Sequence, residues 1–172
     1  MSKTLVALTL AGCLAGADVQ ACGDKFLVIG RGVRAQRAKG AIHHASILMY
    51  LDPRSELPAA VRQSGLETDL KLAGHKLRSV ESRGELGAAL AAGDYDVVLA
   101  GLPDMTVLER QIGAGARPPI LLPILYDPTP EELAAAQRRY RCVMRSPGKK
   151  QHFLALIDEA MVLRSKSVKR EE

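Results

Sequence analysis

Aromatic residues are scarce in this sequence, which contains no Trp and only two Phe. Apolar residues nevertheless make up 47% of the chain, so a normal core can form, and that core must be aliphatic, built from Leu, Val, Ile and Ala. A length of 172 residues is enough for one domain plus appendages. We therefore expect a single aliphatic domain with terminal extensions.

Recognisable catalytic and metal-binding patterns are also missing. The three cysteines include no Cys-x-x-Cys pair, which excludes a redox pair and a zinc ribbon of the usual spacing. No Ser-His-Asp or Cys-His set stands in a recognisable context. The histidines His43, His44, His75 and His152 give no support to a metal site. The sequence thus predicts no catalytic residue, no metal and no cofactor.

No apolar run long enough to cross a membrane stands at the N-terminus. Lys3 is followed by an uncharged apolar stretch from Leu5 to Ala17, which is too short for a spanning helix and typical of a signal-peptide core. Cleavage could follow Ala17 or Ala21, and we favour Ala21. The alternative is Leu10–Cys13, which resembles a bacterial lipobox and would allow a lipid anchor at Cys13. We expect a periplasmic or secreted protein, with a membrane-tethered lipoprotein as the alternative.

Export changes what the remaining cysteines can do. Cys22 and Cys142 would both lie in an oxidising compartment, where two thiols are candidates for one disulfide bond. The alternative is a pair of buried free thiols.

Acidic residues are absent between Asp24 and Asp52, and the net charge of +5 is concentrated there. The basic residues of this segment are Lys25, Arg31, Arg34, Arg37 and Lys39. A second basic cluster consists of Arg138, Arg139, Arg141, Arg145, Lys149 and Lys150. A Cys22–Cys142 bond would bring the basic segment near the N-terminus beside this second basic cluster. Such a face suits an anionic envelope surface or an acidic protein partner, whereas nucleic acid is disfavoured because no recognition helix is evident. A solvated polar face is the plainer interpretation.

A glycine pattern follows the short strand expected at Phe26–Ile29. Gly30, Gly32 and Ala35 fit G-x-G-x-x-A, and Asp52 ends the next strand, as in a dinucleotide-binding unit. The helix that should follow carries many basic residues and is interrupted by Gly40, which weakens this interpretation. Nucleotide binding by these four residues is therefore an alternative to a strand and a basic loop.

The remainder of the chain alternates between strand and helix patterns. Expected strands cover 46–51, 76–81, 97–99, 119–126 and 142–145, and expected helices cover 57–73, 86–92, 106–112, 129–140 and 151–163. We expect the first helix to be interrupted near Ser64-Gly65, and the fourth strand to bulge or break at Pro123. This order requires a doubly wound parallel sheet of the α/β class.

In detail, the region from Ile47 to Met161 resembles the receiver domain of two-component response regulators. The motifs that carry the resemblance are Ala73-Gly74-His75-Lys76-Leu77, Tyr95-Asp96-Val97-Val98-Leu99 and Ser146-Pro147. The resemblance implies a flavodoxin-like five-stranded parallel sheet in the order 2-1-3-4-5. We expect a signal peptide at 1–21, a basic extension with an extra strand or loop at 22–45, the receiver-like domain at 46–163 and a charged, frayed tail at 164–172.

The resemblance also locates the residues that would carry receiver chemistry. The phosphoacceptor aspartate at the end of the third strand corresponds to Gly101, and the acidic pair that holds Mg²⁺ corresponds to Leu51 and Asp52. The lysine before the proline becomes Ser146, and the hydroxyl residue of the fourth strand falls near Leu125 or Tyr126. We expect Asp104 to cap the next helix. Glycine has no nucleophile, and one carboxylate is a poor Mg²⁺ site, so the resemblance implies a receiver that cannot be phosphorylated.

These observations together predict a non-enzymatic, exported, receiver-like module that binds a protein partner or an anionic envelope surface. The residues expected to contact it are Arg31, Arg34, Arg37, Lys39, Arg138, Arg139 and Arg141. The alternative is a small-ligand or nucleotide-binding protein that uses the Gly30–Ala35 loop or the cleft at the carboxyl ends of the strands, near Asp52, Gly101 and Tyr126.

Overall fold

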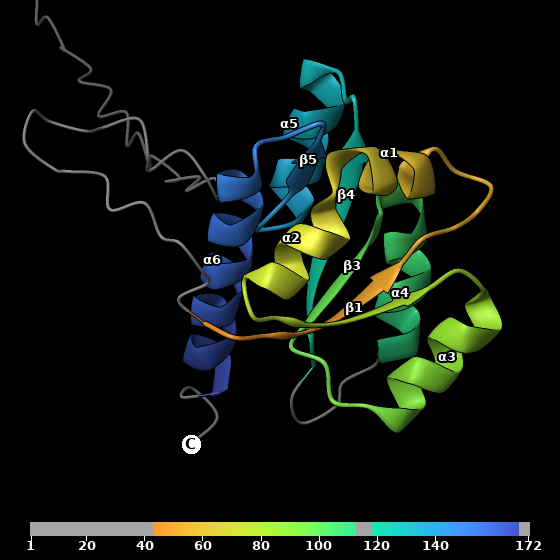
Figure 1. Ribbon diagram of the computed structural model, residues 1–172, viewed down its shortest axis with the longest axis vertical. Helices are drawn as coiled ribbons and strands as arrows, with labels where there is room; N and C mark the ends of the chain where they lie inside the picture. The colour runs from red at the N-terminus through yellow and green to blue at the C-terminus, as the bar shows by residue number, and fades with distance from the viewer. Residues whose placement is uncertain (1–42, 113–117, 169–172) are drawn as a thin grey trace, which may run out of the picture.

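The computed structural model describes residues 43–112 and 118–168 and shows strands alternating with helices (Figure 1). The strands are β1 (Ser46–Tyr50), β2 (Lys76–Val80), β3 (Val97–Gly101), β4 (Ile120–Tyr126) and β5 (Met144–Ser146). The helices are α1 (Leu57–Ser64), α2 (Leu66–Leu72), α3 (Arg83–Ala92), α4 (Met105–Ile112), α5 (Pro130–Arg139) and α6 (Lys150–Val168). A 3₁₀ turn at Leu102–Asp104 joins β3 to α4.

The strands form one parallel sheet in the order β2-β1-β3-β4-β5. This confirms the predicted order 2-1-3-4-5, which is that of flavodoxin-like folds. β3 lies at the centre, and its residues pair with β1 on one side and β4 on the other. All the carboxyl ends of the strands therefore meet at one edge of the sheet.

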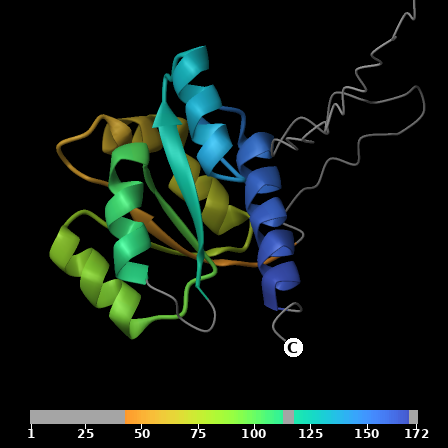
Figure 2. The same ribbon diagram turned by 180° about the vertical axis from the view of Figure 1, so that it is seen from behind.

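Helices cover both faces of this sheet (Figures 1 and 2). α1, α2 and α6 pack on one face, and α3, α4 and α5 pack on the other. The residues of β3 alternate accordingly: Val97 and Leu99 belong to the first core cluster, and Val98 and Ala100 to the second. Because β3 is covered on both sides, its continuous apolar run is the pattern expected of a buried parallel strand.

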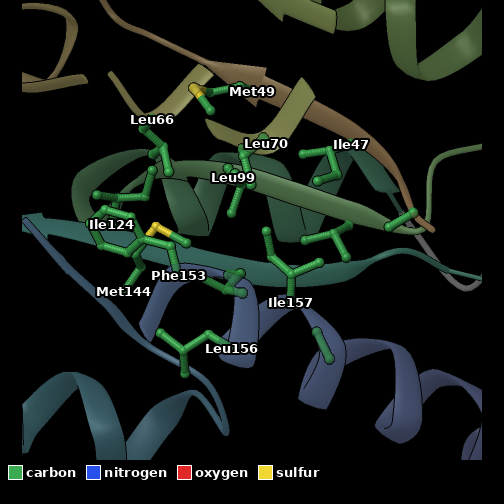
Figure 3. Close-up of a cluster of buried hydrophobic side chains, with 14 of the residues drawn as sticks. Ile47, Met49, Leu66, Leu70, Leu99, Ile124, Met144, Phe153, Leu156 and Ile157 are labelled. Carbon is green, nitrogen blue, oxygen red and sulfur yellow. The ribbon is translucent and has the colours of Figure 1, made fainter. Parts of the chain in front are cut away.

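The first core cluster contains mostly aliphatic side chains, as the composition predicts. Figure 3 shows Leu99 of β3, Leu70 of α2 and Ile157 of α6 within one cluster, and all three are fully buried. Within the part of the chain that the structure describes, Phe153 is the aromatic member of that cluster. Burying one such large side chain stabilises a fold by about 1.5–3 kcal/mol, so this layer fixes α6 and α2 against the strands.

Two glycines set the ends of helices. Gly65 has a φ of +65° and separates α1 from α2, which confirms the interruption predicted near Ser64-Gly65. Gly74 has a φ of +92°, and a Cβ there would lie 2.6 Å from the ring of His44. Both positions favour glycine because other residues are strained at positive φ.

Capping boxes begin two of the helices. Thr129 accepts a hydrogen bond from the N–H of Glu132, whose carboxylate accepts one from the N–H of Thr129, as the sequence predicts. Ser82 and Glu85 make the same arrangement at the start of α3. Each box satisfies backbone donors that would otherwise lack a partner.

The predicted bulge at Pro123 is wrong. β4 is continuous, and Pro123 keeps its place opposite Ala100 of β3. Ile120 donates its N–H to Asp96 of the β3 side, and Asp127 donates its N–H to Ser146 of the β5 side. Since alternate residues of a parallel strand face opposite neighbours, the nitrogen of Pro123 faces β5, at a level where that strand has not yet begun. Pro123 therefore costs no ladder hydrogen bond.

The last strand and the last helix differ from their predicted limits. β5 begins at Met144 rather than Cys142, and α6 continues to Val168 rather than ending at Leu163. The expected frayed tail from Arg164 is therefore wrong up to Val168, because Arg164 lies within the helix and pairs with Asp96. No helix within residues 43–112 and 118–168 has the length and hydropathy needed to span a membrane.

Candidate functional site

A cavity of about 660 Å³ opens at the edge where β1, β3 and β4 end. It brings together Asp52, Gly101 and Tyr126, the three residues predicted to flank a cleft at the carboxyl ends of the strands. In doubly wound sheets this edge is the usual location of ligand sites. Its charged lining residues are Asp52, Arg54, Glu56, Arg83, Asp104 and Glu132.

Asp52 follows β1, and both of its carboxylate oxygens are occupied by Arg54. The Nε of Arg54 donates to Oδ1 at 3.1 Å and its Nη2 donates to Oδ2 at 2.9 Å, while the backbone N–H of Arg54 also donates to Oδ1 at 3.0 Å. These bonds lower the pKa of Asp52 to about 2. A bidentate guanidinium contact of this kind holds the carboxylate in a fixed orientation and neutralises it.

Gly101 ends β3, at the position that the resemblance to receivers assigns to the phosphoacceptor. Its backbone is extended, with a φ of −62° and a ψ of 147°, which any L-residue adopts. A Cβ there would meet Asp104 Oδ2 at 3.5 Å and Pro103 Cδ at 3.6 Å, which are ordinary contacts. The fold therefore has room for a side chain here, and glycine leaves the position without a nucleophile.

Asp104 is the last residue of the 3₁₀ turn that joins β3 to α4, and it directly precedes Met105, the first residue of α4. No hydrogen bond from its carboxylate to the first turn of α4 is found among the described residues, so its capping role stays a prediction. Burial raises the pKa of Asp104, and the nearby charge of Asp52 raises it further. The 3₁₀ turn places this carboxyl over the end of β3, so it faces the cavity.

The resemblance to receiver domains implies a Mg²⁺ ion at this edge, but the residues present do not fit it. Mg²⁺ needs several unencumbered oxygen ligands in near-octahedral geometry. Leu51 is buried and apolar, Gly101 offers no side-chain oxygen, and Asp52 already holds a guanidinium. Among the described residues no group of three or more His, Cys, Asp or Glu side chains could hold a metal ion.

The two other positions that the resemblance assigns to receiver chemistry, Ser146 and Tyr126, also lack the residues expected there. Ser146 is buried, and its backbone carbonyl accepts the N–H of Asp127 at 2.7 Å. Its side chain is too short to replace the reach of a lysine. Tyr126 pairs with Ser146 across β4 and β5, and its side chain is 43% exposed at the rim of the cavity.

The predicted interaction residues have different surroundings. Arg139 donates to Glu109 at 2.6 Å and lies over the ring of Tyr140, 5.3 Å from its centroid. Arg138 and Arg141 are exposed. Arg31, Arg34, Arg37 and Lys39 of the basic extension lie outside the described residues. The glycine pattern of Gly30, Gly32 and Ala35 also lies there.

The predicted disulfide stays a prediction. Cys142 is 1% exposed and belongs to the first core cluster, and its expected partner Cys22 lies outside the described residues. The signal peptide, Cys13 and the strand expected at Phe26–Ile29 lie outside them as well.

Sequence reasoning missed Arg54 and Arg83, the two cations of the cavity. A signal for Arg54 exists, because Asp-Pro-Arg directly after a strand is a tight turn in which the aspartate can bond the residue two positions on. Arg83 has no such signal. It reaches the cavity because α3 starts beside the carboxyl end of β1, which is a tertiary arrangement.

Comparisons with known proteins identify no family. No protein-family model matches the chain, and no curated protein matches it. Among solved structures, the flavodoxin-like domain of a Synechococcus sp. protein is similar over 73% of this chain and 99% of that one, with 15% identity and a TM-score of 0.34. This neighbour indicates neither a ligand nor an activity, and the flavodoxin-like fold stated above follows from the chain's own strand order.

Proposed function

We propose that the protein is a non-enzymatic, receiver-like module that works by binding a partner and not by accepting a phosphoryl group. The observation that supports this most is Gly101 at the end of the central strand. The bidentate contact of Arg54 with Asp52 also supports the proposal, because it occupies the carboxylate at the end of β1 that could otherwise bind a metal. The partner is an envelope protein or an anionic envelope surface.

Export is part of the same proposal. The charge-free apolar run after Lys3 supports a cleaved signal peptide and a periplasmic or secreted location, and a lipid at Cys13 is the alternative. A disulfide between Cys22 and Cys142 would then hold the basic extension against the domain. Intact mass of the secreted protein tests all three points, because it gives the cleavage site, any lipid and the two-hydrogen loss of a disulfide.

The proposed contact surface is basic. Replacing Arg31, Arg34 and Arg37 together by Ser should abolish retention of envelope proteins, or of vesicles containing anionic lipid, on the immobilised full chain. The matched control replaces three exposed arginines of the domain, Arg62, Arg78 and Arg110, by Ser. Retention that falls equally in both triple variants would reflect net charge alone and would contradict a specific surface.

A second function is supported by the cavity at the strand edge. It is large enough for a small ligand and combines two arginines with several carboxylates, so a zwitterionic metabolite or a nucleotide is the class that it would bind. A thermal-shift screen separates the two functions. A saturable rise in Tm with one ligand, lost on replacing Arg83 by Gln, would favour the ligand-binding function.

A further inference from the structure

Three cavities of the described residues differ in how their charges are balanced. The cavity at the strand edge has two arginines and four carboxylates. A second one, near Tyr95 and Pro119, has Asp94 as its charged residue. The third, of about 360 Å³, lies between β5 and α6, and we call it the β5–α6 groove. Its cations outnumber its acids, which sets it apart from the other two.

The floor of the β5–α6 groove is apolar. Val143, Phe153 and Leu156 line it, and each is almost fully buried by the rest of the fold. Pro147 and Ala155 add further apolar surface. The volume falls within the range of small-molecule sites. An apolar ligand chain placed here would be buried away from water, and no core residue would have to move.

The rim of the groove is cationic. Arg145, Lys149 and His152 line it and are exposed, and Glu159 is its one acid. In the same basic cluster, Arg139 pairs with Glu109 and Lys150 pairs with Asp69. No ion pair or side-chain hydrogen bond is found for Arg145, Lys149 or His152 within the described part of the chain. The two permanent charges beside the apolar floor are therefore available to an anion.

We propose that the β5–α6 groove binds a small amphiphilic anion, an alkyl chain with a carboxylate head. The chain lies on Val143, Phe153 and Leu156, and the carboxylate contacts Arg145 and Lys149. The charge pattern selects this class because an uncharged chain would leave the cations unused and a cationic head would be repelled. Arg145 and Lys149 belong to the second basic cluster, but Arg31, Arg34 and Arg37, whose replacement tests partner binding, do not line the groove. The two proposals are therefore tested on different residues and can fail separately.

Titration of the full chain with decanoate, followed by calorimetry and by amide chemical shifts, tests the proposal. We expect saturable binding with shifts confined to Val143–Leu156. Octanoate should bind about fifteenfold more weakly, because it lacks two methylenes. Decan-1-ol and decyltrimethylammonium should bind at least about tenfold more weakly than decanoate, because the head must be anionic.

Paired variants localise the site. Replacing Arg145 and Lys149 by Gln should weaken decanoate binding about tenfold. Replacing Arg62 and Arg110, two exposed arginines that do not line the groove, by Gln makes the same change in net charge and should leave binding unchanged. Ala155→Trp should block the groove without altering its charge, and Ala134→Trp on the exposed side of α5 is its control. Circular dichroism establishes that each variant folds, and the exposed Gln pair tests the site even if Ala155→Trp does not fold.

Several results would overturn the proposal. They are no saturable binding of decanoate, equal affinity for the cationic amphiphile, equal loss in both Gln pairs, and shifts centred on Asp52 and Gly101. A stable dimer that buries β5 and α6, or a groove that opens to decanoate only when residues 1–42 are removed, would assign this surface to another occupant and would also overturn it.

Discussion

Arg54 determines the electrostatics at the end of β1. The carboxylate of Asp52 accepts from both the side chain and the backbone of Arg54, and this contact lowers its pKa to about 2. The guanidinium is exposed to solvent, so the pair orients Asp52 more than it stabilises the fold. A carboxylate held in this way is a poor metal ligand even though its position matches that of an acidic receiver residue.

Removing this guanidinium should change how Asp52 titrates. In Arg54→Met, the pKa of Asp52 should rise from about 2 toward its ordinary value of 3.8, since its largest stabilising contact is lost. Carbon-detected NMR of the Asp52 carboxyl during a pH titration measures this. Arg83→Met is the control and should raise the same pKa far less, because Arg83 acts on Asp52 through its charge alone and is the smallest of the contributions. Equal shifts in both variants would contradict the assignment.

His75 gives the described domain a pH dependence near neutrality. It is 5% exposed, its Nδ1 accepts the N–H of Ala45 at 3.2 Å, and its buried Nε2 has no hydrogen-bond partner among the described residues. Burial lowers its pKa below the ordinary 6.5, the charge of nearby His44 lowers it further, and Asp158 opposes the shift. The unfolded chain therefore binds a proton at a higher pH than the folded chain.

The stability that comes from keeping His75 neutral should therefore be fully present above pH 6.5. The free energy of unfolding should then decrease as the pH falls through the lowered pKa of His75. His75→Asn keeps an acceptor for Ala45 and cannot ionise, so its unfolding free energy should vary less between pH 7 and pH 5 than that of the unmodified protein. Urea unfolding at several pH values measures this. His152→Asn, at an exposed histidine, should retain the full slope, and a flattened slope there instead would show that another group is responsible.

At the scale of elements, Asp96 joins two strands and a helix. Its Oδ2 accepts the N–H of Ser46 at 2.7 Å, and its Oδ1 pairs with Arg164 of α6. The carbonyl of the same residue accepts the N–H of Ile120. Asp96, which directly precedes β3, thus fixes the amino-terminal ends of β1 and β4 and the last turns of α6, which explains why that helix continues beyond Leu163.

Asp96→Ala should destabilise the protein by about 1–3 kcal/mol, because a charged acceptor is removed from partly buried donors. Chemical denaturation measures the loss. Asp94→Ala changes the same charge at an exposed position two residues earlier and should have an effect within about 0.5 kcal/mol. A comparable loss in both variants would mean that the effect comes from the loop and not from the contacts of Asp96.

Elements with local signals could be predicted from the sequence. Thr129 and Glu132 mark the start of α5, Gly65 marks the break between α1 and α2, and the apolar run of β3 marks a strand buried on both faces. The errors at Pro123 and at the end of α6 concern tertiary contacts. Pro123 is tolerated because β5 is short, and α6 is long because Arg164 reaches Asp96. Neither partner is close in sequence.

In the candidate site, too, local signals could be predicted from the sequence and tertiary contacts could not. The position of Asp52, Gly101 and Tyr126 at one edge could be predicted, because parallel strands bring their carboxyl ends together. The charge state of the edge could not, since it depends on Arg54 turning back onto Asp52 and on Arg83 approaching from α3. The β5–α6 groove depends on how a helix lies beside an edge strand, and it has no pattern in the sequence.

At the scale of the whole molecule, the proposed disulfide joins the extension to the domain. Closing so long a loop would stabilise the folded protein by roughly 4–5 kcal/mol on the chain-entropy account. Cys22→Ser should therefore lower the unfolding free energy by about this amount under oxidising conditions and by little in the presence of dithiothreitol. Equal stability of the two proteins without reductant would argue against the bond.

The most direct test of the account asks whether the strand edge accepts a phosphoryl group. The full chain is incubated with acetyl phosphate and Mg²⁺, beside a receiver domain with an intact acidic site, and intact mass is measured without acid treatment. Because Gly101 has no nucleophile and Asp52 is held by Arg54, the mass of this protein should stay unchanged while that of the receiver increases. A gain of one phosphoryl group that maps to Asp52 or Asp104 would contradict the account.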